Sequence, residues 1–277
     1  MPQRVETGAN KFPPEPFTFL RGNGDKNQIH SVGLIFEPDF FTLYAYADRK
    51  GRETIGFSTL PNDADPPPPF SAEPLYAFAF TPEWTLVPRA TFQPEDAKDH
   101  LIFNTAATAK DEAAYDVLPL LDTVVVYRKN PAAEQTLDKI HPGLRMKHLA
   151  TAALDLMFRS TKSRSEPFLW IHLVGRHAMV AVGRDGSPIL ANTVETTHPS
   201  DLEFFVLFAA KQLGLDMHTD LYLTGQSKNQ DQISALLKRH FRIHPPPLPP
   251  GSESNEPVEQ TLSIKHFIGL FAPACAS

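Results

Sequence analysis

The segment from Phe168 to Gly225 constrains the fold more than any other part of the chain. Its short apolar runs are separated by polar turns, and one longer apolar run precedes the last of them. The runs are Phe168–Val174, Ala178–Val182, Ile189–Val194, Ser200–Leu213 and Leu221–Thr224. Short apolar runs bounded by turn residues predict strands, and the longer run predicts a helix. The order strand, strand, strand, helix, strand is one half of a two-lobed fold.

Turn and cap residues support these boundaries. Asp185 and Gly186 supply the positive φ angles that a tight hairpin turn requires. Ser200 and Glu203 predict a capping box at the start of the helix, and Gly214 predicts its end. The middle of this helix has no polar stripe, so we expect it to be covered on nearly every side, with Phe205 and Phe208 almost wholly buried.

The first part of the chain repeats the pattern. Three further strands are predicted at Val32–Phe36, Phe40–Tyr46 and Thr54–Phe57, with turns at residues 37–39 and 48–51. The same order of strands and turns indicates a structural duplication. Four prolines at residues 66–69 stand where the first copy should have its helix, so that helix is expected to be shortened or lost.

The remaining elements follow from periodicity and caps. Strands are predicted at Leu75–Phe80, Trp84–Val87, Asp122–Tyr127, Phe241–Ile243 and Thr261–Phe271, and helices at Pro94–Asn104, Asp111–Leu118, Pro131–Ile140, Met146–Phe158 and Asp231–His240. The helix at 146–158 is expected to pack between the lobes because its apolar residues recur at helical spacing. We divide the chain into a flexible tail (1–28), a first lobe with an insertion (29–160) and a second lobe (161–277) that carries a proline-rich loop at 245–260.

Composition excludes several classes of protein. The chain has 277 residues, of which 42% are hydrophobic, so it can bury a sizeable core. No apolar stretch approaches the roughly 18 residues that a membrane span needs, and Met1–Gln28 lacks a signal-peptide core, so a cytoplasmic protein is expected. A net charge of −6 argues against unspecific nucleic-acid binding. Cys275, the single cysteine, has no partner for an internal disulfide and no activating neighbour in sequence.

Several short motifs resemble one known family. They are Trp84-Thr85-Leu86-Val87-Pro88 with Phe103-Asn104-Thr105, Asp111-Glu112-Ala113-Ala114-Tyr115-Asp116, and Leu213-Gly214-Leu215-Asp216 leading to Leu223-Thr224-Gly225. Over residues 30–245 the chain resembles an uncharacterised Bacteroidetes family, a domain of unknown function with an actin-like ATPase fold, in the sugar-kinase, chaperone and actin superfamily. The resemblance implies an α/β protein with mixed sheets and two ribonuclease-H-like lobes that face a cleft. Fold alone does not specify its chemistry.

The resemblance also implies where a nucleotide would bind. Active members of the superfamily place an acidic, glycine-containing turn after the first strand of each lobe. The corresponding turns here are Phe36-Glu37-Pro38-Asp39 and Val174-Gly175-Arg176-His177, and neither has the Asp-x-Gly arrangement. Pro38 removes an amide donor, although Glu37 or Asp39 could hold magnesium and Arg176 could pair with a phosphate. The alternative is that all three are ordinary surface residues.

The motif on the adenosine side is reduced as well. In Leu223-Thr224-Gly225-Gln226-Ser227 only Gly225 remains of a glycine-rich loop, and the Gln226 side chain occupies space that a base or ribose would need. Other chemistries have less support. The histidines lack metal-binding spacing, no nucleophile elbow or phosphate loop occurs, and Glu37, Asp39 and Asp48 as a nuclease site are better explained as surface carboxylates.

Two hypotheses of different classes remain. The first is a non-catalytic, actin-like scaffold that binds an unidentified protein partner and uses no cofactor, with no catalytic or metal-binding residues. The second is a divergent ATP-binding or ATP-hydrolysing protein that uses magnesium and the residues Glu37, Asp39, Arg176, Thr224 and Gly225. The lost turn signatures favour the first.

Overall fold

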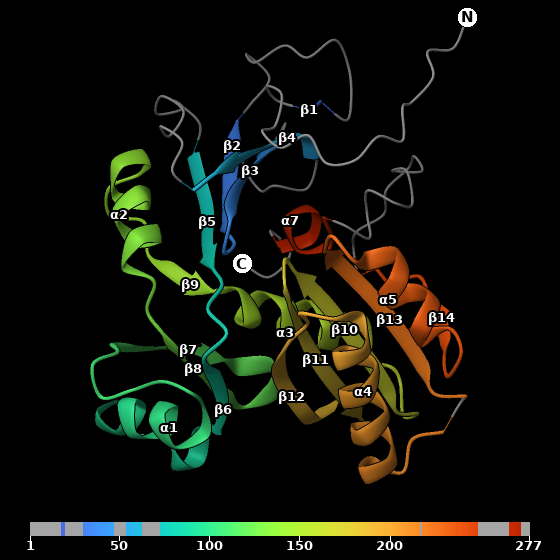
Figure 1. The fold of residues 1–277 in the computed structure, drawn as a ribbon. Helices are drawn as coiled ribbons and strands as arrows, with labels where there is room; N and C mark the ends of the chain where they lie inside the picture. Colours follow the sequence, from blue (N-terminus) through green and yellow to red (C-terminus); the bar gives the residue numbers. More distant parts are fainter. Residues whose placement is uncertain are drawn as a thin grey trace, which may run out of the picture.

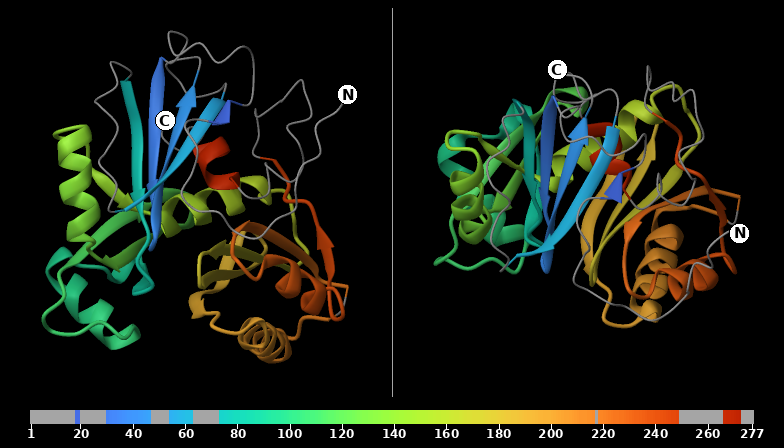
Figure 2. Two further views of the ribbon diagram at one scale, coloured as in Figure 1. Left: turned by 45° about the horizontal axis from the view of Figure 1, so that its top comes forward. Right: turned by 90° about the horizontal axis from the view of Figure 1, so that it is seen from above.

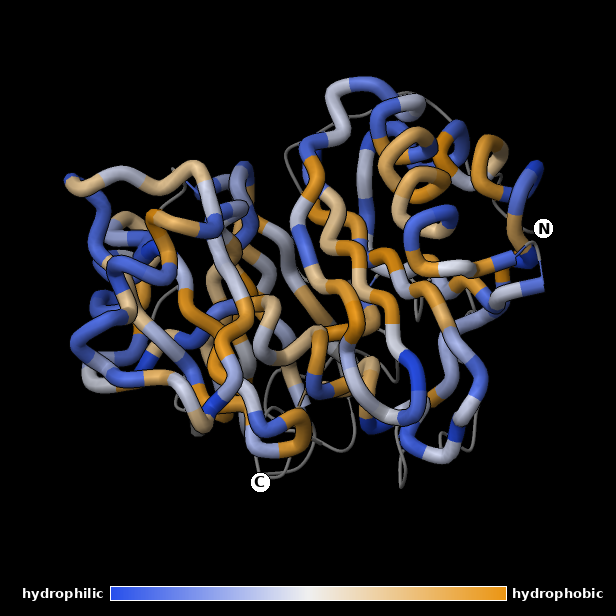
Figure 3. The backbone as a smooth tube through the Cα atoms, turned by 90° about the horizontal axis from the view of Figure 1, so that it is seen from below, coloured by the Kyte–Doolittle hydropathy of each residue, from blue (hydrophilic) through white to orange (hydrophobic). Residues whose placement is uncertain are grey.

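A computed structural model describes residues 18–19, 30–46, 54–62, 73–216, 218–248 and 266–272. The four prolines at 66–69, Cys275, most of the predicted tail and all but residues 245–248 of the predicted proline-rich loop lie outside these ranges. Two large sheets stand side by side, with a smaller sheet next to the first (Figure 1). Apolar residues concentrate in the strands and polar residues in the connecting turns (Figure 3).

The two large sheets have matching topology. The first has the order β1 (Thr18–Phe19), β4 (Thr54–Pro61), β3 (Phe40–Tyr46), β2 (Ser31–Phe36), β5 (Glu73–Ala79), β9 (Met146–His148), and the second has the order β12 (Ser187–Glu195), β11 (His177–Arg184), β10 (Phe168–Val174), β13 (Asp220–Gln226), β14 (Arg242–His244). Apart from β1, which pairs antiparallel with β4 at the edge of the first sheet, each sheet has three antiparallel strands followed by two parallel ones. The predicted duplication and the two-lobed α/β fold are confirmed.

The second lobe matches its prediction closely. The turn between β11 and β12 has positive φ at Asp185 (52°) and Gly186 (72°), as the sequence predicted. Helix α4 (Pro199–Leu213) lies on one face of the sheet and ends at Gly214, where φ is 66°. Its N-terminus lies earlier than predicted, because His198 and Asp201, not Ser200 and Glu203, form the capping box. Proline at the first helical position accounts for the earlier start.

The expected burial of α4 is wrong. The helix buries Leu202 and Val206 against the sheet, but Phe204 is 72% exposed, Phe205 is only partly buried and Phe208 is 55% exposed. A helix that covers one face of a sheet buries only the side that faces the strands. No described element covers the outer side of α4, so its apolar content does not lead to burial.

Between β5 and β9 the first lobe carries an inserted subdomain. Its sheet has the order β6 (Trp84–Pro88), β8 (Thr123–Arg128), β7 (Ala113–Leu118), and its helical elements are η2 (Arg89–Thr91), η3 (Pro94–Asp96), α1 (Ala97–Asn104) and η4 (Pro119–Leu121). The predicted helix at 111–118 is therefore wrong. This segment pairs antiparallel with β8. Tyr115 and Val117 favour a strand, and the pairing partner decides the conformation.

Helices α2 (Pro131–Ile140) and α5 (Gln230–Leu237) and strand β14 confirm the predictions for their segments. The predicted helix at 146–158 begins later, because Met146–His148 extends the first sheet as β9 and α3 runs from Leu149 to Ser160. The His148 side chain caps α3 by accepting a hydrogen bond from the backbone N–H of Ala150 at 3.1 Å. α3 is almost wholly buried in a core that includes residues of both large sheets, so its predicted place between the lobes is confirmed.

The end of the described chain is a helix where a strand was predicted. α7 (Phe267–Phe271) packs against α3, β2 and β13, between the two large sheets (Figures 1 and 2). Tyr46 and Tyr76 donate hydrogen bonds to the carbonyl oxygen of Gly269, at 2.6 and 3.1 Å. A Cβ atom at Gly269 would lie 1.9 Å from the Tyr44 ring, so glycine permits this close approach. Packing against three elements, rather than local propensity, selects the helix.

Candidate functional site in the cleft between the lobes

The turns after β2 and β10 face each other across the cleft. A Cβ atom at Gly175 would lie 3.8 Å from Asp39 Oδ2, so the two turns are in near contact. The backbone N–H of Gly175 donates to the carbonyl oxygen of Gln226 at 3.1 Å, which joins the second turn to the end of β13. The fold therefore brings Glu37, Asp39 and Gln226 to one place, as the resemblance implied for the two turns.

Glu37 is a buried carboxyl group at this junction. The residue is 9% exposed, it forms a hydrogen bond with Gln226, and its Oε2 atom has no hydrogen-bond partner. Burial raises its pKa to about 8; nearby Asp39 acts in the same direction, and the Gln226 hydrogen bond opposes both. At neutral pH the group is mostly protonated. A neutral carboxyl group is a poor ligand for magnesium, which prefers charged oxygen donors.

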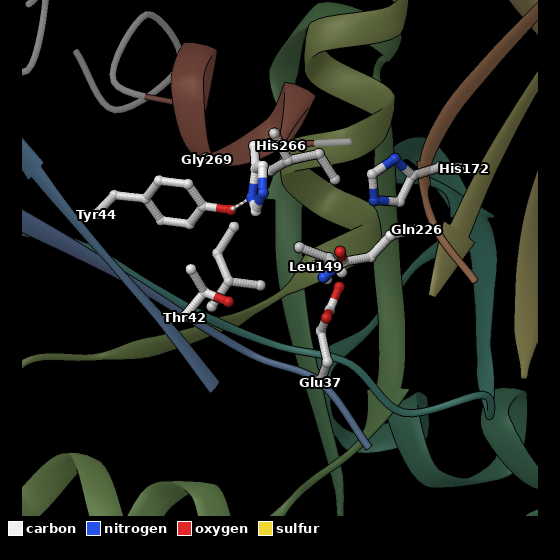
Figure 4. A pocket seen from close by; sticks show the side chains of 10 residues that line it. Glu37, Thr42, Tyr44, Leu149, His172, Gln226, His266 and Gly269 are labelled. Atoms are coloured by element: carbon white, nitrogen blue, oxygen red, sulfur yellow. Dashed lines mark hydrogen bonds between the residues drawn. The ribbon is translucent and has the colours of Figure 1, made fainter. Parts of the chain in front are cut away.

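Residues of both lobes, His266 and α7 line a small, partly open cavity beside Glu37 (Figure 4). Its walls include Glu37, Tyr44, His172, Gln226, His266 and Gly269. Its volume is about 10 Å³, which is close to the space that one water molecule requires. Sites for small organic ligands are typically about 300–1,000 Å³. In this arrangement the cavity has no room for a nucleotide.

Thr224 and Gly225 are engaged within the second sheet. Thr224 Oγ1 accepts a hydrogen bond from Trp170 Nε1 at 2.9 Å and lies 2.9 Å from His172 Nδ1. Gly225 has φ of 78°, and a Cβ atom there would lie 2.1 Å from the carbonyl oxygen of Leu173. The sheet therefore requires glycine at position 225, so a bound nucleotide is not needed to explain the presence of this glycine.

Arg176 is not among the residues that line the cavity. Its side chain is 71% exposed and lies 3.7 Å from Glu195. Five residues were predicted to bind a nucleotide. Of these, Glu37 and Asp39 lie together at the junction of the two turns, and Arg176 lies on its solvent side. Thr224 and Gly225 have structural roles within the second sheet. A nucleotide role for them stays a prediction.

Sequence analysis missed the histidines and the tyrosine of the cavity. His172 is neutral, because burial lowers its pKa to about 3. His266 is hydrogen-bonded through Nδ1 to the Tyr44 hydroxyl at 3.0 Å. His172 pairs with Thr224 across the parallel strands β10 and β13, so a predicted strand register could have found this contact. The Tyr44–His266 contact spans most of the chain and leaves no local signal.

A second buried polar cluster joins the inserted subdomain to α3. Asp116 accepts hydrogen bonds from the His148 backbone N–H at 2.8 Å and from Thr151 Oγ1 at 2.9 Å, and burial raises its pKa. The His148 ring is stacked on Tyr127 and is neutral, since burial lowers its pKa to about 3. All these groups have protein partners, so the cluster is structural. Across the described residues, no three His, Cys, Asp or Glu side chains are placed to hold a metal ion.

Comparison with known proteins places this geometry in a family. Residues 76–243 match the model of a family described as "Protein of unknown function (DUF3822)". The chain belongs to this family. The match extends from β5 through the inserted subdomain to β14, and so covers the cleft residues of the second lobe. No curated protein matches the chain.

Solved structures of other proteins share the fold of this chain, and two of them are compared with it below. A Bacteroides thetaiotaomicron protein with an actin-like ATPase fold and unknown function has a TM-score of 0.66 at 15% identity, covering 80% of this chain and 93% of that one. The PilM-PilN type IV pilus biogenesis complex contains a chain with a TM-score of 0.52 at 10% identity, covering 90% and 99%. At such identities the likeness shows the actin-like ATPase fold alone.

Over the part of the chain that is described, no helix is long and apolar enough to cross a membrane.

Proposed function

We propose that this protein is a non-catalytic scaffold with an actin-like fold, which binds another protein and does not turn over ATP. The observation that carries the proposal is that the chain's own side chains fill the cleft. Gln226 reaches Glu37 from the opposite lobe, and the α7 segment closes the space beside them. The remaining cavity is the size of one water molecule.

The chemistry of the two turns supports the same conclusion. Phosphoryl transfer depends on positioning and on neutralising charge, so a productive site needs a charged metal ligand and free backbone amides. Glu37 is protonated at neutral pH, and Pro38 has no amide to donate. Neither turn supplies what the reaction needs.

A protein partner is supported by the fold comparison. One structure with this fold belongs to the PilM-PilN type IV pilus biogenesis complex, in which it assembles with another protein. The partner of the present chain is a proposal, and the fold does not identify it. A cytoplasmic location is likewise part of the proposal.

A nucleotide-binding assay tests the proposal. A ligand at a hundred times its dissociation constant stabilises the folded state by about 2.7 kcal/mol, which for a chain of this size raises the melting temperature by roughly 5 to 10 °C. We expect a shift near zero with millimolar Mg-ATP and no phosphate release above a boiled control. A shift of several degrees that is lost in Arg176→Ala would overturn the scaffold proposal. Gly225 is unsuitable for this control, because its replacement would disturb the sheet.

One observation favours the alternative, a divergent ATP-binding protein that uses magnesium. Glu37 stands where the superfamily has its acidic turn, and its Oε2 atom has no partner. If the lobes open, Glu37 could ionise and, together with Asp39, face a metal ion. Stabilisation by Mg-ATP that increases with pH and disappears in Glu37→Gln would establish this alternative.

A further inference from the structure

The outer face of α4 carries two neighbouring phenylalanines in solvent. Phe204 and Phe208 are 72% and 55% exposed, and their stacked rings have centroids 6.4 Å apart. The helix lies at the outer edge of the second lobe, on the side away from the first lobe (Figures 1 and 2). Neighbouring exposed aromatic side chains form an apolar patch, and the largest such patch on a protein often has a function.

Charged residues flank this pair at both ends. Asp201 precedes Phe204 by three residues, Lys211 follows Phe208 by three, and both are exposed. One carboxylate oxygen of Asp201, Oδ2, accepts a hydrogen bond from the His198 backbone N–H at 2.8 Å. The four residues are spaced three, four and three apart, so they form one stripe along the helix with the seam spacing of a coiled coil. We call Asp201, Phe204, Phe208 and Lys211 the α4 stripe.

The α4 stripe is complementary to itself. Its spacing is the same from either end, and its midpoint lies at the level of Val206. A second copy of the helix, antiparallel about a two-fold axis at this level, places Phe204 at the height of Phe208 in the other copy. Asp201 then lies at the height of the other copy's Lys211, which it attracts. Closed two-fold interfaces require such a self-complementary patch.

We propose that the α4 stripe is the interface of a symmetric, antiparallel dimer of this chain. Four phenylalanine rings supply its apolar centre, and two Asp201–Lys211 pairs set its register. An aromatic side chain buries on the order of 150–250 Å², so four partly exposed rings supply well under the roughly 1,200–2,000 Å² of a stable complex. The dimer is therefore weak, with a dissociation constant on the order of 0.1 to 1 mM.

Sedimentation velocity on the full chain, over roughly three decades of concentration up to about 1 mM, tests the interface. The wild type should pass from monomer to dimer, and Phe204→Ser/Phe208→Ser should stay monomeric. Both side chains are exposed, so this variant should keep the wild-type melting temperature. The matched control is Ile102→Ser/Phe103→Ser on α1, which removes exposed apolar residues elsewhere (Phe103 is 89% exposed). The control should dimerise like the wild type.

Charge reversal tests the antiparallel register. Asp201→Lys alone and Lys211→Glu alone each bring like charges together and should weaken the dimer by about tenfold. An equimolar mixture of the two variants restores both attractive pairs and should form heterodimers as readily as the wild type dimerises. Three results would overturn the proposal: a wild type that is monomeric throughout, an α1 control that dimerises no better than the α4 variant, or a mixture that is no stronger than its separate components.

Discussion

Glu37→Gln should remove a large part of the pH dependence of stability. The folded-state pKa of Glu37 is about 8 and its ordinary value is 4.5, because burial disfavours the charged form. An acid whose pKa is raised by folding contributes stability that is complete below pH 4.5 and is lost as pH rises through 8. Between pH 5 and pH 8 the unfolded chain releases its proton while the folded chain keeps most of it. Integrating over this window gives a loss on the order of 3–4 kcal/mol for the wild type.

The Glu37→Gln variant should not lose this part of its unfolding free energy, since glutamine has a similar shape and no charge to bury. We expect the unfolding free energies of the two proteins in urea to be within about 1 kcal/mol at pH 5, with the variant more stable by several kcal/mol at pH 8. The neutral histidines His148 and His172 titrate equally in both proteins, so they cancel in the difference. Asp39→Asn is the matched control, because that carboxylate lies in the same turn but is exposed. Parallel pH profiles for the wild type and Glu37→Gln would refute the reasoning, since they would mean that Glu37 is solvated in the folded state.

Three further predictions concern packing. Phe208→Ala should lower the unfolding free energy by less than about 1 kcal/mol because the ring is mostly in solvent, whereas Leu202→Ala on the buried side of α4 should cost about 2–5 kcal/mol in the same urea titration. Gly225→Ala should cost more than about 2 kcal/mol, because the new Cβ atom meets the Leu173 carbonyl group. Gly186→Ala is its control: it has a similar φ of 72° with open space around it, so only the backbone strain of roughly 1 kcal/mol should appear in its melting temperature.

The second lobe could be predicted from sequence because its signals are local. Strands β10 and β11 are buried on both faces and appear as continuous apolar runs. The Asp185-Gly186 turn sets the hairpin between β11 and β12. The same reasoning failed for β7 and α7, whose conformations depend on neighbours far along the chain. β7 is a strand because it pairs with β8, and α7 is a helix because it packs against three other elements.

The sequence predicted where the candidate site lies but not which contacts its residues make. The turn that contains Glu37 follows the first strand of its lobe, so the duplicated pattern was enough to place it in the cleft. The Glu37–Gln226 contact and the raised pKa depend on how closely the lobes approach, which no local pattern encodes. Exposure of Phe208 was missed for a related reason: apolar residues on a helix predict burial only if another element covers that side.

Closure of the cleft has a calculable effect on any ligand that must open it. If α7 stays packed on the second lobe, opening the cleft would break the hydrogen bonds that join the first lobe to the α7 segment or directly to the second lobe. They are Tyr44–His266, Tyr46–Gly269, Tyr76–Gly269 and Glu37–Gln226. At about 0.5–1.5 kcal/mol each, the four bonds favour the closed state by roughly 2–6 kcal/mol before apolar contacts are counted. Because a ligand's apparent affinity falls with the population of the competent state, binding would be weakened by a factor of about 30 to 10⁴. A nucleotide with micromolar intrinsic affinity would then bind with an apparent dissociation constant between roughly 30 μM and 10 mM, so closure weakens binding and favours a scaffold even if the open cleft could hold a ligand.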